Sequence, residues 1–251
     1  LLALPTADGQ NVRAAMFLVA AWFALFALPL LLRGPAGAGA LPPRVGFVGA
    51  YRRIWREIRQ EWRRDRNVIY YLGASALFRD GLTGVFTFGA VLGVQVYGVS
   101  SADVLLFGIA ACVVAAVGAV IGGFADDRLG ARRVIITSLV AMIAVGLTLL
   151  TVSGPLAFWI LGLALCLFIG PVGASARTLM MRMAMHGKEG VTFGLYATAG
   201  RAATFLAPWL FSAFIDIFDS DRAGLGGILV VLVLGLVAFA CVRVPGRHVD
   251  A

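Results

Sequence analysis

The segment Gly122-Gly-Phe-Ala-Asp-Asp-Arg-Leu-Gly-Ala-Arg-Arg133 decides the fold, because it joins two long apolar runs with glycines and charged residues. Neither the run before it, 104–125, nor the run after it, 134–176, contains a charged residue. About 20 apolar residues cross the hydrocarbon core of a bilayer, so each run is long enough to span a membrane. The segment therefore predicts a short loop at a membrane surface between two spanning helices.

The composition of the whole chain agrees with a membrane protein. Hydrophobic residues make up 61% of the sequence, charged residues only 14%, and the mean hydropathy is +0.93. Soluble domains contain roughly 45–50% apolar residues, so this chain is not a soluble domain. We predict an all-α, polytopic transmembrane helix bundle with seven spans. They lie at 14–32, about 68–98, 104–125, 190–215 and 223–242, with two more in 134–176, which Ser153-Gly154-Pro155 interrupts.

The distribution of basic residues predicts the orientation. Of the 21 Lys and Arg residues, 17 fall in the segments 33–67, 126–133, 177–189 and 243–251, which alternate with the predicted spans. By the positive-inside rule these segments and the C-terminus are cytoplasmic. The formal charge of +8 therefore indicates topology and lipid contact, and it does not indicate a nucleic-acid partner.

The predicted orientation places the first residue outside, with no initiator Met and no signal sequence to explain it. Leu1–Pro5 resembles the end of an earlier span, so we expect the chain to be the C-terminal part of a longer protein. A complete seven-span protein is the alternative. We divide the chain into an outer segment with the first transmembrane helix (1–33), a cytoplasmic linker (34–67) and a six-helix block (68–251).

The linker contains a predicted amphipathic helix. Apolar residues recur at helical spacing from Tyr51 to Trp62, and eight arginines lie between positions 44 and 66. Such a helix lies in the membrane interface, where the arginines Arg52–Arg66 would contact anionic headgroups. The alternative is that it docks on the cytoplasmic face of the protein itself.

The pattern Gly123-x-x-x-Asp127-Arg128-x-Gly130-x-Arg132-Arg133 resembles the signature loop of the major facilitator superfamily, which joins the second and third helices of each six-helix half. The resemblance implies that these six residues form and break contacts as a transporter changes conformation. Glycines allow helices to approach closely, and arginines can hold carboxylates or helix C-termini. An ordinary tight turn with cytoplasmic arginines is the alternative.

Three further segments resemble one branch of that superfamily, the vacuole-effluxer-like family of autophagy-related amino-acid exporters, which has many bacterial members. They are Phe78–Gly89, Gly170–Arg182 and Lys188–Pro208. The resemblance implies the C-terminal six-helix half of a major facilitator fold plus one preceding helix. It also implies a secondary transporter working by alternating access on a small solute, with amino-acid efflux as the implied activity. We expect a multi-pass protein of the bacterial inner membrane.

Charged residues inside predicted spans are the candidate site. Arg79 and Asp80 are adjacent in one span, and Arg201 lies in another. Charges within a bilayer are costly and usually mark a pathway, a relay or an ion pair. In one interpretation Asp80 is a proton or cation site, and Arg79 or Arg201 meets a substrate carboxylate. In the other, Asp80 and Arg201 form a buried pair that only locks two helices.

Helix-breaking and small residues complete the predicted site. Gly170-Pro171 and Pro208 predict kinks or broken helices, which often mark transporter binding sites, and Gly194 and Gly200 belong to the family-like segment before Pro208. The sequence shows no nucleophile–base pair, phosphate loop or metal motif, so we expect neither an enzyme nor a cofactor. A seven-span receptor or sensor is the alternative function, although it would not explain the Gly123–Arg133 loop.

Overall fold

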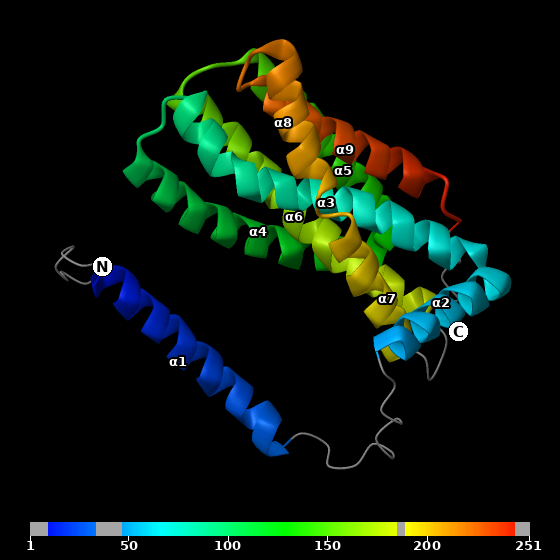
Figure 1. The fold of residues 1–251 in the computed structure, drawn as a ribbon. Coiled ribbons are helices and arrows are strands. Elements are labelled where there is room, and N and C mark those ends of the chain that lie inside the picture. Colours follow the sequence, from blue (N-terminus) through cyan, green and yellow to red (C-terminus); the bar gives the residue numbers. More distant parts are fainter. Residues whose placement is uncertain (1–9, 34–46, 185–188, 244–251) are drawn as a thin grey trace. The chain divides into compact units, whose positions relative to one another are not determined.

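A computed structural model describes residues 10–33, 47–184 and 189–243, and Figure 1 shows their fold. The chain divides into two compact units, Leu1–Ala50 and Tyr51–Ala251. The first unit contains α1 (Gln10–Arg33), whose apolar part, Arg13–Pro29, is shorter than the other membrane-capable helices. The seventh span therefore remains a prediction. Most of the predicted Gly/Pro/Ala linker, residues 34–46, lies outside the described residues.

In the described residues of the second unit every secondary-structure element is a helix, and six segments are long and apolar enough to cross a membrane. Helix α2 extends into it across the boundary between the units. The spanning segments agree with six of the predicted spans. The helices are α2 (Phe47–Arg64), α3 (Arg66–Gln95), α4 (Ser101–Leu129), α5 (Ala131–Thr151), α6 (Pro155–Met183), α7 (Glu189–Ala202), α8 (Leu206–Phe218) and α9 (Ala223–Ala240).

Local sequence signals explain several helix ends. Asp65 precedes α3, and its carboxylate accepts a 2.8 Å hydrogen bond from the backbone N–H of Asn67, as an N-cap residue does. The break between α5 and α6 falls at Gly154, where φ is +98°, followed by Pro155 at the start of α6. Proline suits the first position of a helix, and glycine tolerates positive φ. The predicted interruption at Ser153-Gly154-Pro155 is confirmed.

The predicted loop between the third and fourth spans is shorter than expected. Helix α4 continues to Leu129 and α5 begins at Ala131, so Gly130 is the single residue between them. Its φ of +87° favours glycine, and its N–H donates a 2.8 Å hydrogen bond to the carbonyl of Asp126. The charged residues of the segment therefore lie in helical turns, because charge alone does not end a helix.

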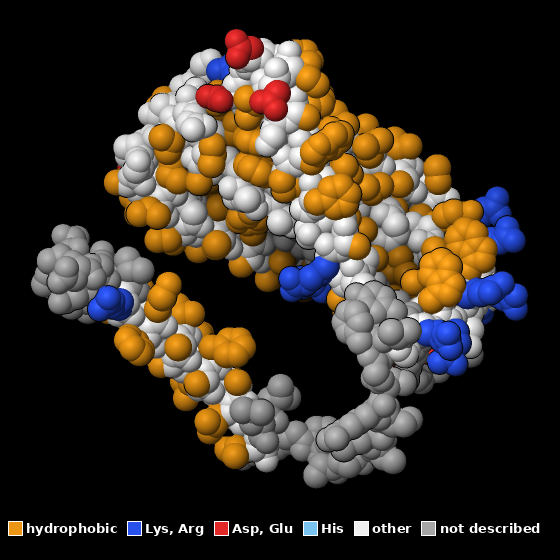
Figure 2. Space-filling view, in the orientation of Figure 1, with side chains coloured by type: hydrophobic (Ala, Val, Ile, Leu, Met, Phe, Trp, Pro, Cys, Tyr) orange, Lys and Arg blue, Asp and Glu red, His pale blue; other side chains and the backbone are white. Residues whose placement is uncertain are grey.

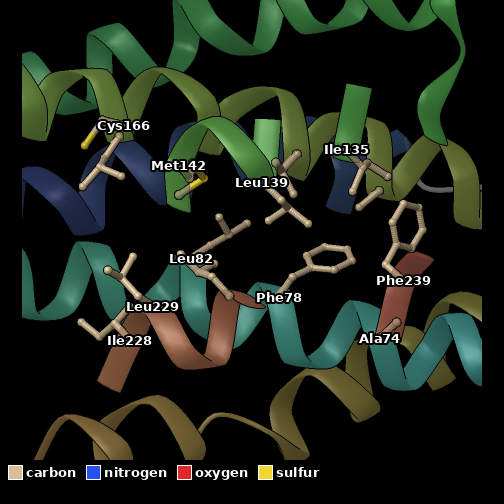
Figure 3. Close-up of a cluster of buried hydrophobic side chains, with 14 of the residues drawn as sticks. Ala74, Phe78, Leu82, Ile135, Leu139, Met142, Cys166, Ile228, Leu229 and Phe239 are labelled. Atoms are coloured by element: carbon tan, nitrogen blue, oxygen red, sulfur yellow. The ribbon is translucent and has the colours of Figure 1, made fainter. Parts of the chain in front are cut away.

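The core lies between α3, α5, α6 and α9 (Figure 3). Phe78 on α3 is completely buried and makes an edge-to-face contact with Phe239 on α9, with ring centroids 5.9 Å apart. Gly235 lets α9 approach α3 at this level, because a Cβ there would lie 2.7 Å from the backbone nitrogen of Phe78. A well-packed aromatic core of this kind fixes the relative positions of the helices that line the site.

Helices α4 and α6 pack through glycines. A Cβ on Gly122 would lie 2.5 Å from Cβ of Pro171, and a Cβ on Gly118 would overlap the carbonyl oxygen of Leu167. Pro171 lacks an N–H, so it leaves the Leu167 carbonyl without its intrahelical donor, and this carbonyl faces α4. Gly118 and Gly122 are close-packing residues. Helix α6 continues through Pro171, so no break forms there.

Charged side chains gather at opposite ends of the second unit (Figure 2). Basic residues cover the end that carries α2, and acidic residues cover the turn between α8 and α9, where Asp219 and Asp221 lie. Within α2, Arg64 pairs with the buried Glu61 at 2.8 Å, and its guanidinium donates a 3.5 Å hydrogen bond to the carbonyl of Met183 on α6. The alternative in which α2 docks on its own protein therefore has direct contacts, while Trp55 remains exposed.

Candidate solute site at a broken span

The span predicted at 190–215 consists of two helices, α7 and α8, with a turn at 203–205 between them (Figure 1). Within the turn, the N–H of Leu206 donates a 3.0 Å hydrogen bond to the carbonyl of Ala203. Pro208 is the third residue of α8, where its missing N–H costs no helical hydrogen bond. The helix break predicted from Pro208 is confirmed. The turn begins at residue 203, five residues before the proline.

The carboxylate of Asp80 lies at this break. Its Oδ2 accepts a 2.6 Å hydrogen bond from the N–H of Ala207 in the first turn of α8, and the residue is only 2% exposed. A carboxylate at a helix N-terminus satisfies a free N–H group and interacts favourably with the helix dipole. No ion pair within 4.0 Å joins Asp80 to Arg201 in the described part of the chain. The structure therefore does not form the buried Asp80–Arg201 pair considered from the sequence, and one carboxylate oxygen of Asp80 binds a backbone N–H instead.

Arg79 is held by Tyr196 on α7. Its Nη1 donates a 3.1 Å hydrogen bond to the carbonyl of Tyr196, and its guanidinium carbon lies 4.1 Å from the centroid of the same ring. A Cβ at position 200 would lie 2.6 Å from Nη1 of Arg79, so Gly200 leaves the space for the guanidinium. A cation–π contact and a hydrogen bond together restrict this side chain to one position.

Two tyrosines that sequence reasoning missed support the site. The rings of Tyr71 and Tyr196 are parallel within 9°, with centroids 6.5 Å apart. The hydroxyl of Tyr71 donates a 2.6 Å hydrogen bond to the carbonyl of Ala176, next to Arg177. The sequence signal for this support is a tyrosine at each of two buried helical positions, since a buried tyrosine hydroxyl needs a hydrogen-bond partner. These contacts link α3, α6 and α7 around one cavity.

The cavity has a volume of about 650 Å³ and is lined by α3, α4, α6 and α7 with the turn that follows α7. It brings together Arg79, Asp80 and Arg201 from the predicted site, with Gly170 and Gly200. Pro171, Gly194 and Pro208 do not line it. The complete lining is Arg79, Asp80, Leu82, Thr83, Ala115, Ala119, Ile169, Gly170, Gly173, Ala174, Arg177, Ala197, Gly200, Arg201 and Thr204.

Arg177 is the charged cavity residue that sequence reasoning placed elsewhere. The sequence assigned it to a cytoplasmic loop, because the uncharged run ends at 176. Helix α6 instead continues to Met183, which keeps Arg177 in the helix and on the wall of the cavity. A basic residue at the end of an apolar run can lie in a loop or in the helix on the cavity wall, and only the packing of α6 distinguishes these two positions.

The signature segment forms contacts between helix ends, away from the lining of the cavity. Asp126, which is 4% exposed, pairs with Arg182 of α6 at 3.3 Å. Arg132 donates a 2.9 Å hydrogen bond to the carbonyl of Ala240, the last residue of α9. The expectation that the arginines hold a carboxylate or a helix C-terminus is confirmed for Arg132. The buried carboxylate is Asp126, whereas the neighbouring Asp127 is exposed.

The remaining residues of the signature pattern are less enclosed. Arg128 and Arg133 are exposed, and no atom lies within 4 Å of a Cβ placed on Gly123. Gly130 is the link between α4 and α5. The functional role predicted for these residues remains a prediction.

The six helices long and apolar enough to cross a membrane, in the part of the chain that the structure describes, define a multi-pass integral membrane protein. The family model described as "Vacuole effluxer Atg22 like" matches residues 3–251. The chain belongs to this family. It is also 20% identical over 239 residues to the MFS-type transporter YxiO of Bacillus subtilis (strain 168), covering 95% of this chain and 55% of that protein. The chain thus spans about half the length of this relative.

Proposed function

We propose that the protein is a secondary transporter that carries a small polar solute across the membrane by alternating access, through the cavity at the α7–α8 break. In this proposal 68–251 is the C-terminal six-helix half, and α1 is a further span that precedes it. The relative YxiO is called an MFS-type transporter, and this chain corresponds to about half of its length. The solute class implied by the resemblance of Phe78–Gly89, Gly170–Arg182 and Lys188–Pro208 to the vacuole-effluxer-like family is an amino acid.

The observation that carries the proposal is the charge of the cavity. Three arginines and one aspartate line it, and two of these four charges, Arg79 and Asp80, lie in the middle of the spanning helix α3. Charged groups at such a depth are expensive unless they face a water-filled pathway or bind a partner. Discontinuous helices beside such groups are typical of transporter binding sites.

Asp80 is the proposed coupling residue for a proton or a cation. Its carboxylate holds the N-terminus of α8 through the N–H of Ala207, and the charge of the carboxylate strengthens this hydrogen bond. Binding of a proton or cation would weaken the hold on α8. The geometry therefore supports a link between the charge at Asp80 and the position of a half-helix.

The contacts of the signature segment are the proposed conformational latch. The Asp126–Arg182 pair joins α4 to α6, and the Arg132–Ala240 bond joins α5 to α9. Both lie at the basic end of the unit, which we propose is cytoplasmic, together with the C-terminus. The membrane is then the bacterial inner membrane, and Arg52–Arg66 lie near its anionic headgroups.

The test is a flux measurement on the full-length transporter that contains this chain, reconstituted in proteoliposomes. Counterflow of radiolabelled amino acids and other small polar solutes should show saturable exchange. Substitution Arg201→Gln in the cavity should reduce it, while Arg243→Gln, at an exposed position outside the cavity lining, should not. A protein that binds a solute but exchanges none would favour the alternative, a membrane receptor or sensor.

A further inference from the structure

The cavity has an excess of positive charge. Its lining contains three guanidinium groups, Arg79, Arg177 and Arg201, and one carboxylate, Asp80. One oxygen of that carboxylate already accepts the N–H of Ala207, and none of the three arginines forms an ion pair within the described residues. Arginine is always protonated, so the lining keeps this excess charge at any physiological pH.

Uncompensated charge in a membrane-embedded cavity has a high energetic cost. The partly buried guanidinium of Arg79 loses part of its hydration there, and only a counter-charge or hydrogen bonds restore the loss. A zwitterionic solute brings as much positive as negative charge, so it cannot compensate the excess. A solute with a net negative charge can.

Arg79 is already in position to bind such a solute. The cation–π contact with Tyr196 fixes the plane of the guanidinium, and the carbonyl of Tyr196 accepts from Nη1. A guanidinium has five N–H donors, so donors remain for a ligand. A fixed planar fork matches the two oxygens of a carboxylate or phosphate and loses little entropy on binding.

Arg177 is supported from behind by the same tyrosine pair. Tyr71 stacks on Tyr196 and donates to the carbonyl of Ala176, which immediately precedes Arg177 on α6. Arg177 and Arg201 are both exposed, so their side chains can reach a solute in the cavity. The three arginines come from α6 and α7 as well as from α3, and so they meet only where the fold assembles this cavity.

We propose that the transported solute is a small organic anion, whose anionic oxygen group, a carboxylate or a phosphate, binds Arg79, while Arg177 and Arg201 compensate the remaining charge. This inference rests on the proposed function and specifies its substrate class. An acidic amino acid belongs to this class, whereas a neutral one does not. The cavity of about 650 Å³ suits a solute of metabolite size.

The test compares matched solutes on the full-length transporter. Thermal stabilisation of the purified protein and counterflow in proteoliposomes are measured with glutamate against glutamine, succinate against succinamide, and glycerol phosphate against glycerol. The anion of a preferred pair should bind at least about tenfold more tightly than its neutral or zwitterionic counterpart, the scale of one charge-assisted hydrogen bond. Preference within the first two pairs identifies a carboxylate, and preference within the third pair alone identifies a phosphate.

Variants connect the preference to the arginines. Arg79→Gln should abolish the difference within the preferred pair, and Arg79→Lys should restore part of it, because lysine keeps the charge but lacks the planar fork. Arg177→Gln should weaken anion binding without altering the fold, since this residue is exposed. Arg243→Gln is the control outside the cavity lining and should bind like the wild type.

The outcomes separate this inference from the proposed function. Transport of glutamine or another zwitterion as efficient as that of its anionic counterpart would overturn the anion inference and leave the transporter proposal intact. Equal binding by wild type and Arg79→Gln would also overturn it. If no solute in the panel binds or exchanges, both proposals are wrong.

Discussion

Two helix contacts in this protein show opposite ways of packing in a membrane. Helices α4 and α6 meet through Gly118, Gly122 and Gly170, which lie against the backbone of the facing helix or, at Gly122, against Pro171. Helix α3 meets α7 and α8 through Arg79 and Asp80, whose polar atoms bind backbone groups of the broken span. The α4–α6 contact forms because glycine has no side chain, whereas the contact of α3 with α7 and α8 is made by charged side chains.

The difference indicates which contact can change. A glycine contact has many atoms at close range and loses them all when the helices separate. A contact made by one hydrogen bond to the N–H of Ala207 can be exchanged for a bond to water or solute when the cavity opens. We therefore expect the α4–α6 pair to move as one rigid element and the α7–α8 break to supply the flexibility.

The strongest test of this comparison is a bulky residue in the glycine contact. Gly122→Leu should prevent normal folding, with a loss of stability above about 3 kcal/mol, because Cβ atoms cannot fit against Pro171. Gly123→Leu, one residue later and without atoms within 4 Å of its Cβ, should fold normally. The measurement is thermal unfolding of both purified variants in detergent. Equal melting temperatures would show that α4 and α6 are not closely packed.

A second test removes the polar contact at the break. Asp80→Ala leaves the buried N–H of Ala207 without an acceptor and should cost about 1–3 kcal/mol of stability. Asp80→Asn keeps an acceptor oxygen and should retain most of the stability, yet lose any proton- or cation-driven accumulation. The two variants are compared by chemical unfolding and by uptake against a gradient. Full coupled uptake by Asp80→Asn would contradict the coupling role.

The spans and the contacts at the broken span differ in how well the sequence predicts them. Six of the seven predicted spans, the interruption at Gly154-Pro155 and the break near Pro208 follow from local chemistry, and the structure agrees with them. The partner of Asp80 could not be predicted from local chemistry, because it is a backbone N–H that becomes available only where the span breaks. Sequence reasoning considered side chains such as Arg201 and overlooked the helix terminus.

Arg177 and Asp126 were missed for a related reason. A run of uncharged residues gives the apolar length of a span, but a helix can continue beyond it, as α4 and α6 do. The functional surface at the end of such a helix depends on which neighbour covers it. Asp126 is buried by its contact with Arg182, whereas the adjacent Asp127 is exposed, and no feature of the sequence distinguishes them.

A third, smaller effect concerns the tyrosines behind the cavity. Tyr71→Phe removes the hydroxyl that binds the carbonyl of Ala176 and should cost about 1 kcal/mol. It should also weaken solute binding, because the helix segment that carries Arg177 becomes less fixed. Tyr70→Phe is the matched control, since Tyr70 is 52% exposed. Both effects are measured by unfolding and by solute titration, and identical behaviour of the two variants would contradict the supporting role.

The smallest effect is expected at the signature segment. Arg132→Gln loses a charge and a hydrogen bond at the C-terminus of α9 and should cost about 0.3–1 kcal/mol. Its transport rate should fall more than its solute affinity if the contact is a latch. Arg133→Gln, at an exposed position, provides the control for stability. Equal transport rates for wild type and Arg132→Gln would reduce the contact to a structural cap.

The single-residue link at Gly130 has a consequence for how the chain is made. Helices α4 and α5 are joined so tightly that they must enter the bilayer as one hairpin, yet the glycine face of α4 contacts α6. During synthesis that face stays uncovered until α6, residues 155–183, has left the ribosome and inserted. Nascent chains arrested before residue 155 should therefore crosslink through α4 to lipid or insertion machinery, and longer chains should crosslink to α6.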